Sequence, residues 1–324
     1  MSIVSKRITR ERKQLEKRSG KQKWKDFINS RTLILMCMPA ILFFVLFSYI
    51  PMPGAYIAFV NFNYAAGIFK SQFIGFKNFE FLLTSGQLWR LTYNTVVYNV
   101  FFIVTSSIAQ IGLALMLNEI RGKWFKKVSQ TVMFLPYFIS FVLVGLFAYN
   151  FLSYDNGMIN HWRMALGMSQ IKFYSEASYW PGILVFINLW KGAGYGSVVY
   201  LASIMSLDTA VVEAADIDGA NEVQKIRFII LPWLQSTFII LTLFAIGGIL
   251  KGNFGLFYNT VGANNMALYK ATDIIETFVF RSLVVNMNFS QGSAVGLYQS
   301  IFGFAVVMLA NAAVKKIEPD YALF

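Results

Sequence analysis

The side chains that most often carry enzyme chemistry are scarce in this chain. Cys37 is the only cysteine and His161 the only histidine among 324 residues. An intrachain disulfide is therefore impossible, and a zinc site built from cysteine and histidine is not expected. The sequence holds no G-x-x-x-x-G-K-[ST] phosphate loop, no H-E-x-x-H pair and no G-x-S-x-G elbow. We expect no catalytic residue, no metal site and no cofactor bound by this chain itself.

Acidic side chains are concentrated instead in one polar segment between two long apolar runs. Residues 213–232 read E-A-A-D-I-D-G-A-N-E-V-Q-K-I-R-F-I-I-L-P. Glu213 and Asp216 lie three residues apart, so on a helix they share a face and could bind basic groups of a partner. Asp218 could instead hold a turn by accepting backbone N–H groups. The small apolar side chains that share another face of this helix are Ala210, Ala214 and Ile217.

The same segment carries the start and stop signals of two short helices. Asp208 or Thr209 can cap the first helix, and Gly219 can end it in a left-handed conformation. Asn221 can cap the second helix, and Pro232 suits the first turn of the apolar helix that follows. The pattern predicts helix, tight turn, helix and membrane span; an ordinary polar loop with two helical turns is the alternative.

The elements on either side of this segment are built for lipid. Hydrophobic residues make up 56% of the chain and charged residues 14%, with a mean hydropathy of +0.54, whereas soluble domains carry about 25% charged residues. Six apolar runs are long enough to cross a bilayer, and runs of this length are typical of helices rather than barrel strands. The predicted spans are Leu33–Ala58, Leu91–Leu117, Val128–Leu152, Trp180–Met205, Pro232–Leu250 and Ser293–Val314.

Basic residues indicate the orientation of these spans. The formal net charge is +12, and eleven of the 28 Lys and Arg residues lie within residues 1–32. With both termini in the cytoplasm, nineteen of the 28 fall in internal segments, as the positive-inside rule favours. We therefore predict a basic cytoplasmic tail (1–32), a membrane domain (33–314) whose segment 207–231 is cytoplasmic, and a cytoplasmic C-terminal tail (315–324). The basic tail is typical of an anchor to anionic lipid, not of nucleic-acid binding, and has no signal-peptide cleavage site.

The spacing of E-A-A, D-G-A and I-x-L-P resembles the EAA signature of binding-protein-dependent ABC importer permeases. Val223 and Ile226 depart from the commonest pattern, in which large aromatic residues occupy these positions. The resemblance covers nearly the whole chain after the basic tail. The motifs F-I-G-F-K-N-F, W-K-G-A-G-Y and T-D-I-I-E-T-F-V-F-R are similar to those of permeases for complex carbohydrates, alginate importers among them.

This resemblance implies an all-α polytopic membrane protein of the type I importer kind, with six transmembrane helices and both termini cytoplasmic, in the bacterial inner membrane. It implies a second, non-identical permease subunit, a cytoplasmic ATPase dimer that binds ATP and Mg²⁺, a solute-binding protein outside, and an oligosaccharide cargo, acidic and alginate-like. ATPase closure would drive alternating access through the cytoplasmic helix. The residues expected to couple to the ATPase are Glu213, Ala214, Ala215, Asp216, Asp218, Gly219, Ala220, Ile229, Leu231 and Pro232.

The substrate pathway is less clearly marked. Lys191 lies within the fourth apolar run, where an unpaired charge is costly, so it is a candidate functional residue that would suit an acidic sugar. Snorkelling to the outer interface, or a later start of the span, explains it equally well. The nearby Gly192, Gly194 and Gly196 could let the backbone bend or approach another chain. The aromatic and amide groups that could also line the path are Tyr195, Asn253 and Tyr258.

Polar residues elsewhere leave two further alternatives open. Those of the second span could line a pathway or form hydrogen bonds between helices; they are Asn94, Asn99, Thr105, Ser106, Ser107 and Gln110. Charged residues before the sixth span could contact the solute-binding protein or pair with neighbours; they are Lys270, Asp273 and Glu276.

Three other functions remain as rivals. A secondary carrier would show inverted repeats and midplane ionisable groups, and a membrane-embedded enzyme would gather acidic or histidine groups on one face; neither pattern is evident. The same permease could also import a neutral sugar or another small solute.

Overall fold

The computed structural model describes residues 30–262 and 264–317, with side chains described to Lys316. Most of the predicted N-terminal tail and of the predicted C-terminal tail therefore lies outside the described residues. The chain divides into two units, Met1–Tyr56 and Ile57–Phe324. In the first unit, α3 (Arg31–Phe44) continues into a π-helical turn (Val45–Tyr49). After Arg31 and Thr32, the side chains of α3 are apolar and nearly all exposed, as expected of a helix in lipid.

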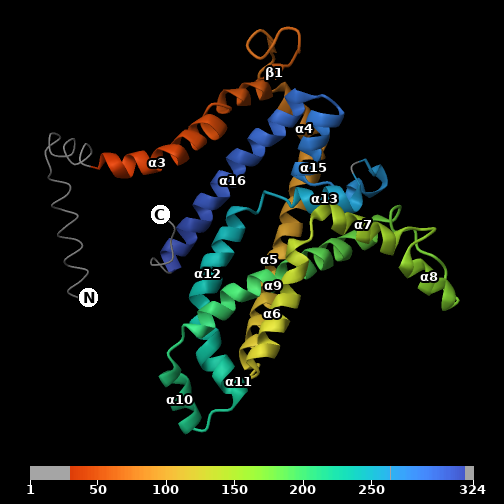
Figure 1. The fold of residues 1–324 in the computed structure, drawn as a ribbon. Coiled ribbons are helices and arrows are strands. Elements are labelled where there is room, and N and C mark those ends of the chain that lie inside the picture. Colours follow the sequence, from red (N-terminus) through yellow and green to blue (C-terminus); the bar gives the residue numbers. More distant parts are fainter. Residues whose placement is uncertain (1–29, 263, 318–324) are drawn as a thin grey trace. The chain divides into compact units, whose positions relative to one another are not determined.

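Long apolar helices form the second unit (Figure 1). The longest, α5 (Gln87–Glu119), packs along α9 (Trp180–Met205), and α12 (Leu231–Gly247) packs against α9 and α16 (Phe289–Ile317). Five helical segments of the described chain are long and apolar enough to cross a membrane, and a sixth is a bent pair of shorter helices. The five are Arg31–Phe59, Gln87–Glu119, Ala177–Met205, Glu222–Gly247 and Phe289–Lys316.

The third predicted span, Val128–Leu152, is not one straight helix. It is divided into α6 (Lys123–Phe138) and α7 (Phe141–Leu152), which meet at 91°. Pro136 lacks a backbone N–H and its ring disfavours a continuous helix. Ser140 begins α7 by accepting a hydrogen bond from the Leu143 N–H. The apolar composition of this run concealed the break.

Short elements occupy the two ends of the helical bundle. At one end, called here the α10 end, lie α10 (Thr209–Ile217) and α11 (Glu222–Lys225), joined to α12 by a π-helical turn (Ile226–Ile230). At the opposite end, the α15 end, lie α4 (Lys77–Thr84) and α15 (Ile275–Phe280), followed by a π-helical turn (Arg281–Val285). The remaining elements are a 3₁₀ turn (Met52–Phe59), α8 (Met158–Ala165), a 3₁₀ turn (Ala177–Tyr179), α13 (Phe254–Val261), a 3₁₀ turn (Met266–Leu268), α14 (Tyr269–Thr272) and the antiparallel pair β1 (Val60–Asn61) and β2 (Gln72–Phe73).

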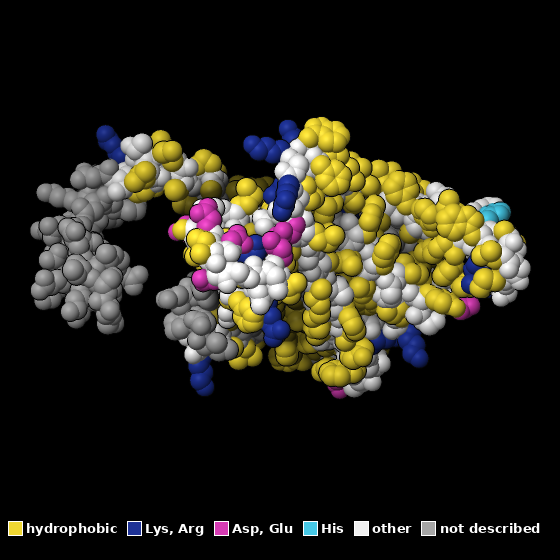
Figure 2. Space-filling model, turned by 90° about the horizontal axis from the view of Figure 1, so that it is seen from below, with side chains coloured by type: hydrophobic (Ala, Val, Ile, Leu, Met, Phe, Trp, Pro, Cys, Tyr) yellow, Lys and Arg dark blue, Asp and Glu magenta, His cyan; other side chains and the backbone are white. Residues whose placement is uncertain are grey.

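The buried core follows the helix contacts. One cluster joins α5, α7, α9 and α13 around Trp180 and Phe257, and a second joins α4, α5, α15 and α16 around Leu91. A third, around Tyr200, joins α5, α9 and α12 towards the α10 end. The outer surfaces remain largely hydrophobic, while acidic side chains gather over α10 and α11 (Figure 2). This distribution suits a bundle whose sides face lipid or other membrane subunits.

Candidate functional site

Helix α10 has defined ends. The Asp208 carboxylate accepts a hydrogen bond from the Ala210 N–H at 3.0 Å, which confirms the predicted N-cap. Gly219 adopts φ 78°, and the Ala220 N–H donates to the Ala215 carbonyl at 2.9 Å. These bonds satisfy carbonyls at the end of the helix and reverse the chain. The predicted tight turn is therefore confirmed, although the Asp218 side chain makes no hydrogen bond within the described residues.

The chain re-enters helix through a reciprocal cap. The Gln224 N–H donates to the Asn221 side chain at 2.9 Å, and the Asn221 N–H donates to the Gln224 side chain at 2.8 Å. The predicted cap at Asn221 is confirmed, and Pro232 lies in the first turn of α12 as expected. Because the helical segment Glu222–Gly247 is a single candidate span, the polar corner is directly continuous with a membrane helix.

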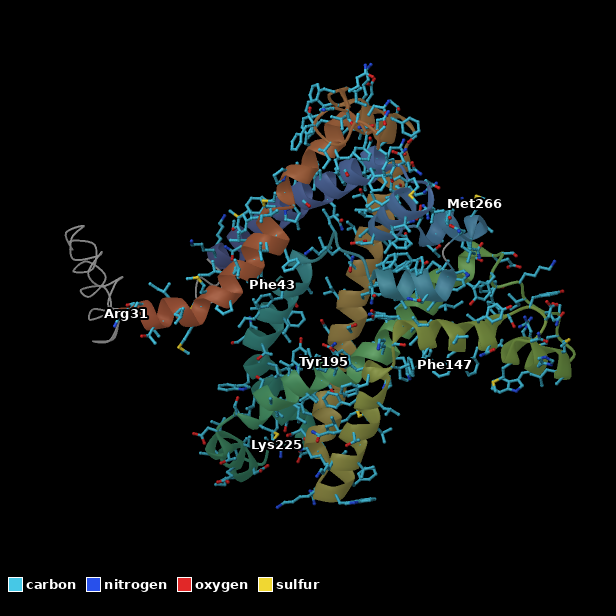
Figure 3. All side chains as sticks on the ribbon, turned by 45° about the horizontal axis from the view of Figure 1, so that its top comes forward. Arg31, Phe43, Phe147, Tyr195, Lys225 and Met266 are labelled. Carbon is cyan, nitrogen blue, oxygen red and sulfur yellow. The ribbon has the colours of Figure 1, made fainter. Side chains whose placement is uncertain are left out.

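A buried lysine fastens α10 to this corner. Lys225 Nζ lies 2.8 Å from Asp216 Oδ1 and 2.8 Å from Glu222 Oε1, and its side chain is only 10% exposed. Asp216 was expected to face basic groups of a partner, but its carboxylate meets this lysine of its own chain. Sequence spacing alone missed Lys225, because nine residues and a chain reversal separate it from Asp216. Figure 3 shows Lys225 at this corner.

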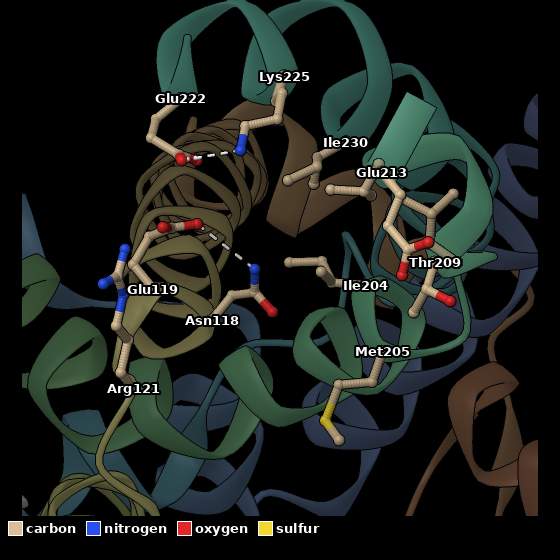
Figure 4. Close-up of a pocket in the computed structure, with 12 residues that line it drawn as sticks. Asn118, Glu119, Arg121, Ile204, Met205, Thr209, Glu213, Glu222, Lys225 and Ile230 are labelled. Atoms are coloured by element: carbon tan, nitrogen blue, oxygen red, sulfur yellow. Dashed lines mark hydrogen bonds and ion pairs between the residues drawn. The ribbon is translucent and has the colours of Figure 1, made fainter. Parts of the chain in front are cut away.

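Glu213 faces a cleft at the α10 end. The cleft has a volume of about 440 Å³ and lies between the ends of α5 and α9 and the α10–α11 corner (Figure 4). Its polar lining mixes carboxylates of Glu119, Glu213 and Glu222 with the basic Arg121. Large apolar side chains are exposed on the same corner: Ile217 (86%), Val223 (72%) and Phe228 (68%).

The other predicted coupling residues lie at the surface of this corner. Ala214, Leu231 and Pro232 are exposed, and Ala215, Ala220 and Ile229 are half-buried. Ala210 and Ile217 are exposed on α10 as well. None of the α10 residues is buried, so the helix is held by its caps and by Lys225 rather than by a core of its own.

The ammonium group of Lys191 has backbone carbonyls of its own chain as partners. Its Nζ donates to the carbonyls of Tyr137 at 2.7 Å, Pro136 at 3.2 Å and Ile139, at the junction of α6 and α7. An ammonium group has three N–H donors, and all three have carbonyl partners. The structure therefore gives Lys191 a role within the fold rather than an unpaired charge directed at an anionic cargo.

The glycines around Lys191 allow close helix packing within the chain. A Cβ on Gly194 would lie 1.9 Å from the Met133 carbonyl oxygen of α6, and one on Gly196 would lie 2.1 Å from the Gln110 side chain of α5. Gly192 has nothing within 4 Å of such a Cβ. Tyr195 stacks on Tyr137 with ring centroids 4.2 Å apart, yet it stays 48% exposed.

The remaining pathway candidates support local structure. Asn253 caps α13 by accepting from the Leu256 N–H at 3.1 Å. Tyr258 is half-buried and stacks on Phe254 with centroids 4.9 Å apart. Contact of these residues with cargo stays a prediction.

Polar residues of α5 mostly bind backbone groups of neighbouring segments. Asn99 Nδ2 donates to the carbonyls of Ile249 at 3.0 Å and Lys251 at 3.1 Å, and Asn94 Nδ2 donates to the Asp273 carbonyl at 2.9 Å. Hydrogen bonding from α5 to the connecting segments before α13 and after α14 thus explains these two asparagines. Thr105 bonds within its own helix, and a cavity of about 230 Å³ is lined by Ser106, Ser107 and Gln110 together with Tyr200 and Thr242.

Two of the three residues expected to meet a solute-binding protein have partners inside the fold. Asp273 is 1% exposed; its carboxylate accepts from Arg281 at 2.7 Å and from the Thr277 hydroxyl at 2.9 Å. Glu276 accepts from Gln299 at 2.7 Å and from the Gly252 N–H. Burial raises the pKa of the Glu276 carboxyl, and its other oxygen has no hydrogen-bond partner among the described residues. Only Lys270 is exposed as expected.

Comparison with known proteins agrees with the fold. Residues 103–321 match the family described as "Binding-protein-dependent transport system inner membrane component". The chain is 32% identical over 288 residues to Protein LplB of Bacillus subtilis (strain 168), covering 89% of this chain and 90% of that protein. It is 33% identical over 289 residues to the polygalacturonan/rhamnogalacturonan transport system permease protein YteP of the same organism, covering 89% of each.

Solved structures of ABC transporters are also similar to this chain. The chain resembles a crystal structure of a bacterial ABC transporter involved in the import of the acidic polysaccharide alginate, with a TM-score of 0.82 and 32% identity, covering 91% of this chain and 99% of that one. A second structure, of a bacterial alginate ABC transporter in complex with alginate pentasaccharide-bound periplasmic protein, matches with a TM-score of 0.81. With its apolar helices and its EAA-type corner, the chain belongs to the inner membrane components of binding-protein-dependent transport systems, as a multi-pass, non-catalytic ABC transporter permease subunit.

Proposed function

We propose that this chain is a permease subunit of an importer for acidic oligosaccharides, and that the α10 corner couples it to an ATPase. The observation that carries the proposal is the likeness to the alginate transporter along 91% of the chain. A second relative, the polygalacturonan/rhamnogalacturonan permease, is also named for a polysaccharide that contains uronic acid. A neutral sugar is the alternative cargo.

The α10 corner has the properties of a docking surface. Its helix is capped at both ends, and Lys225 fixes it to α11, but no α10 side chain is buried. Ile217 and Val223 are 86% and 72% exposed on this corner, over which acidic side chains gather (Figure 2). An exposed apolar patch with charged surroundings is typical of a protein interface. In the proposal, a cytoplasmic ATPase dimer covers this patch and binds ATP and Mg²⁺.

The corner can also transmit movement. A force on α10 passes through the Lys225 ion pairs to α11, and from there through continuous helix into α12. Because α12 packs on α9 and α16, it would shift against the rest of the bundle. A second permease subunit and a solute-binding protein complete the proposed assembly, in which the α10 end faces the cytoplasm and the α15 end faces outwards.

Charge near α13–α15 supports an acidic cargo. Asp273 is buried and Glu276 is half-buried, whereas Lys251 and Lys270 are exposed. The exposed ionised side chains of this region are thus basic, which favours approach of an anion. Lys191 does not contribute to this argument, since carbonyl groups occupy its donors.

The first experiment measures ATPase activity of the complete importer in lipid with its binding protein. We expect stimulation by an acidic oligosaccharide and less by a neutral one of equal length. Stimulation by neutral sugars alone would overturn the acidic cargo and leave the permease assignment intact.

The second experiment tests docking by co-purification of the ATPase. Ile217→Arg places a charge in the proposed interface, and we expect loss of the ATPase from the purified complex. Leu166→Arg is the matched control, because Leu166 is 75% exposed beside α8, away from the corner. Retention of the ATPase by both variants would refute the docking surface.

A further inference from the structure

The junction of α6 and α7 leaves backbone carbonyls that need partners. The last four carbonyls of a helix have no partner within it, and here the chain bends by 91° directly after α6. The Ser140 carbonyl accepts from the Val144 N–H, and the Pro136 carbonyl accepts from the Ile139 N–H at 3.2 Å. In a membrane helix, carbonyls without a protein partner cannot rely on water. A bent span of this kind requires donors from another helix.

Lys191 of α9 supplies those donors. Its Nζ bonds to carbonyls on both sides of the bend, those of Pro136 and Tyr137 within α6 and that of Ile139 just after it. A cation is favourable at the negative end of a helix dipole. These three bonds give partners both to the ammonium group and to the carbonyls at the bend. Neither the charge nor these carbonyls are therefore left unpaired in an apolar environment.

Aromatic rings of both halves flank the ammonium group. Nζ lies 5.7 Å from the ring centroid of Tyr137 in α6 and 4.9 Å from that of Phe141 in α7. Both distances are within the range of cation–π attraction. Lys191 therefore contacts α6, the linker and the first residue of α7, which makes it a bridge across the bend.

The two halves pack on different neighbours. Helix α6 lies against α9, whereas α7 lies against α13. Backbone approach is tight at both contacts: a Cβ on Gly194 would meet α6, and a Cβ on Gly145 of α7 would lie 2.2 Å from the Asn259 carbonyl oxygen of α13. If the groups around α9 and α13 move relative to each other, the bend between α6 and α7 must absorb the change.

We propose that Lys191 is a positioning residue that holds the bend of the third span, and that this fixed bend is needed to couple ATPase closure to movement of the membrane helices. The proposal rests on membership of the permease family and not on the identity of the cargo. It also explains why a lysine lies inside an apolar run, since its ammonium group has carbonyl partners there.

The test uses the complete importer in lipid. Lys191→Met removes the donors and the charge but keeps a long side chain, and Lys191→Arg keeps donors and charge. Spin labels on Val132→Cys of α6 and Phe147→Cys of α7, in a Cys37→Ser background, report the bend as a distance distribution. Both labelled positions are exposed, at 62% and 47%. Basal ATPase activity and stimulation by the loaded binding protein are measured on the same preparations.

We expect a narrow distance distribution in the parent and in Lys191→Arg, and a broader one in Lys191→Met. We expect Lys191→Met to assemble and retain basal ATPase activity but to lose stimulation, and Lys191→Arg to restore it. Should Lys191→Met fail to assemble, Lys191→Gln replaces it, with the same broadening expected.

Three results would overturn the proposal. One is an unchanged distance distribution with normal stimulation in Lys191→Met or, where it is used, in Lys191→Gln. Another is failure of Lys191→Arg to restore coupling. The third is an unchanged bend with selective loss of acidic cargo, which would make Lys191 a cargo ligand.

Discussion

The contact between Gly194 and α6 gives a sharp test of the packing. In Gly194→Ala the new Cβ would lie 1.9 Å from the Met133 carbonyl oxygen. This oxygen belongs to the backbone, so no side-chain rotation can relieve the clash. Helices α6 and α9 must separate by about 1.5 Å to bring this contact from 1.9 Å to the 3.4 Å of an ordinary van der Waals contact.

Separating the two helices has a second cost, because the hydrogen bonds of Lys191 also join α9 to α6. Lengthening the 2.7 Å bond to the Tyr137 carbonyl by that amount takes it beyond hydrogen-bond range. Overpacking a tight site costs about 1–3 kcal/mol, and we expect the upper end here. With roughly 2–4 °C of melting temperature per kcal/mol, the variant should melt roughly 6–12 °C lower.

Gly192→Ala is the matched control. It lies on the same helix, and its added Cβ has nothing within 4 Å. Removing a helix-interior glycine stabilises a helix by about 0.5–1 kcal/mol, so the control should melt at or above the parent temperature. The assay is thermal unfolding of the purified complex, followed by tryptophan fluorescence. Equal melting temperatures for the two variants would refute the close α6–α9 approach.

Two further predictions concern charged groups with internal partners. Burial raises the pKa of Glu276 above the ordinary 4.5, so the folded state holds this proton more tightly than the unfolded state. The contribution of Glu276 to stability is complete below its unfolded pKa and declines as pH rises through the raised pKa. Glu276→Gln should therefore melt higher than the parent at alkaline pH, and the difference should close as the pH falls below the raised pKa. Lys225→Met should free α10 from α11, raising amide exchange in residues 209–217 and lowering binding-protein-stimulated ATPase activity, because Asp216 and Glu222 lose their shared partner.

Each of these has its own control. Glu80→Gln changes an exposed carboxylate in α4, and it should leave the pH profile of the melting temperature unaltered. If the melting temperature of Glu276→Gln depends on pH as that of the parent does, ionisation of Glu276 in the folded state costs no stability. Lys225→Arg is the control for the lysine and should keep both ion pairs. Parent-like amide exchange in residues 209–217 and parent-like stimulation of ATPase activity in Lys225→Met would show that the caps alone hold α10.

The α10 corner was largely readable from sequence because its structure is local. Asp208, Gly219 and Asn221 each act within a few residues of their own position, through a cap or a left-handed turn. Such signals depend on backbone chemistry that neighbours along the chain supply. The pairing of Asp216 with Lys225 was not readable, since it depends on how the turn folds the second helix back onto the first.

The charged residues of the membrane domain show the limit of the same reasoning. Lys191, Asp273 and Glu276 suggested contact with cargo or a partner protein, because an isolated charge in an apolar sequence looks unpaired. Lys191 and Glu276 have partners far along the chain, at Tyr137 and Gln299, which spacing within one segment cannot reveal. Asp273 pairs with the nearby Arg281, as the alternative of pairing with neighbours allowed.

The sequence by itself determined the membrane class, the location of the apolar runs and the polar corner, because hydrophobic length and local capping are properties of contiguous residues. It did not determine that the third run is bent, since Pro136 and Ser140 are compatible with either form until another helix supplies donors. Only the tertiary structure decided that, by bringing α9 so close to α6 that Lys191 reaches the exposed carbonyls. Long-range contact, not local preference, assigns that lysine its partners.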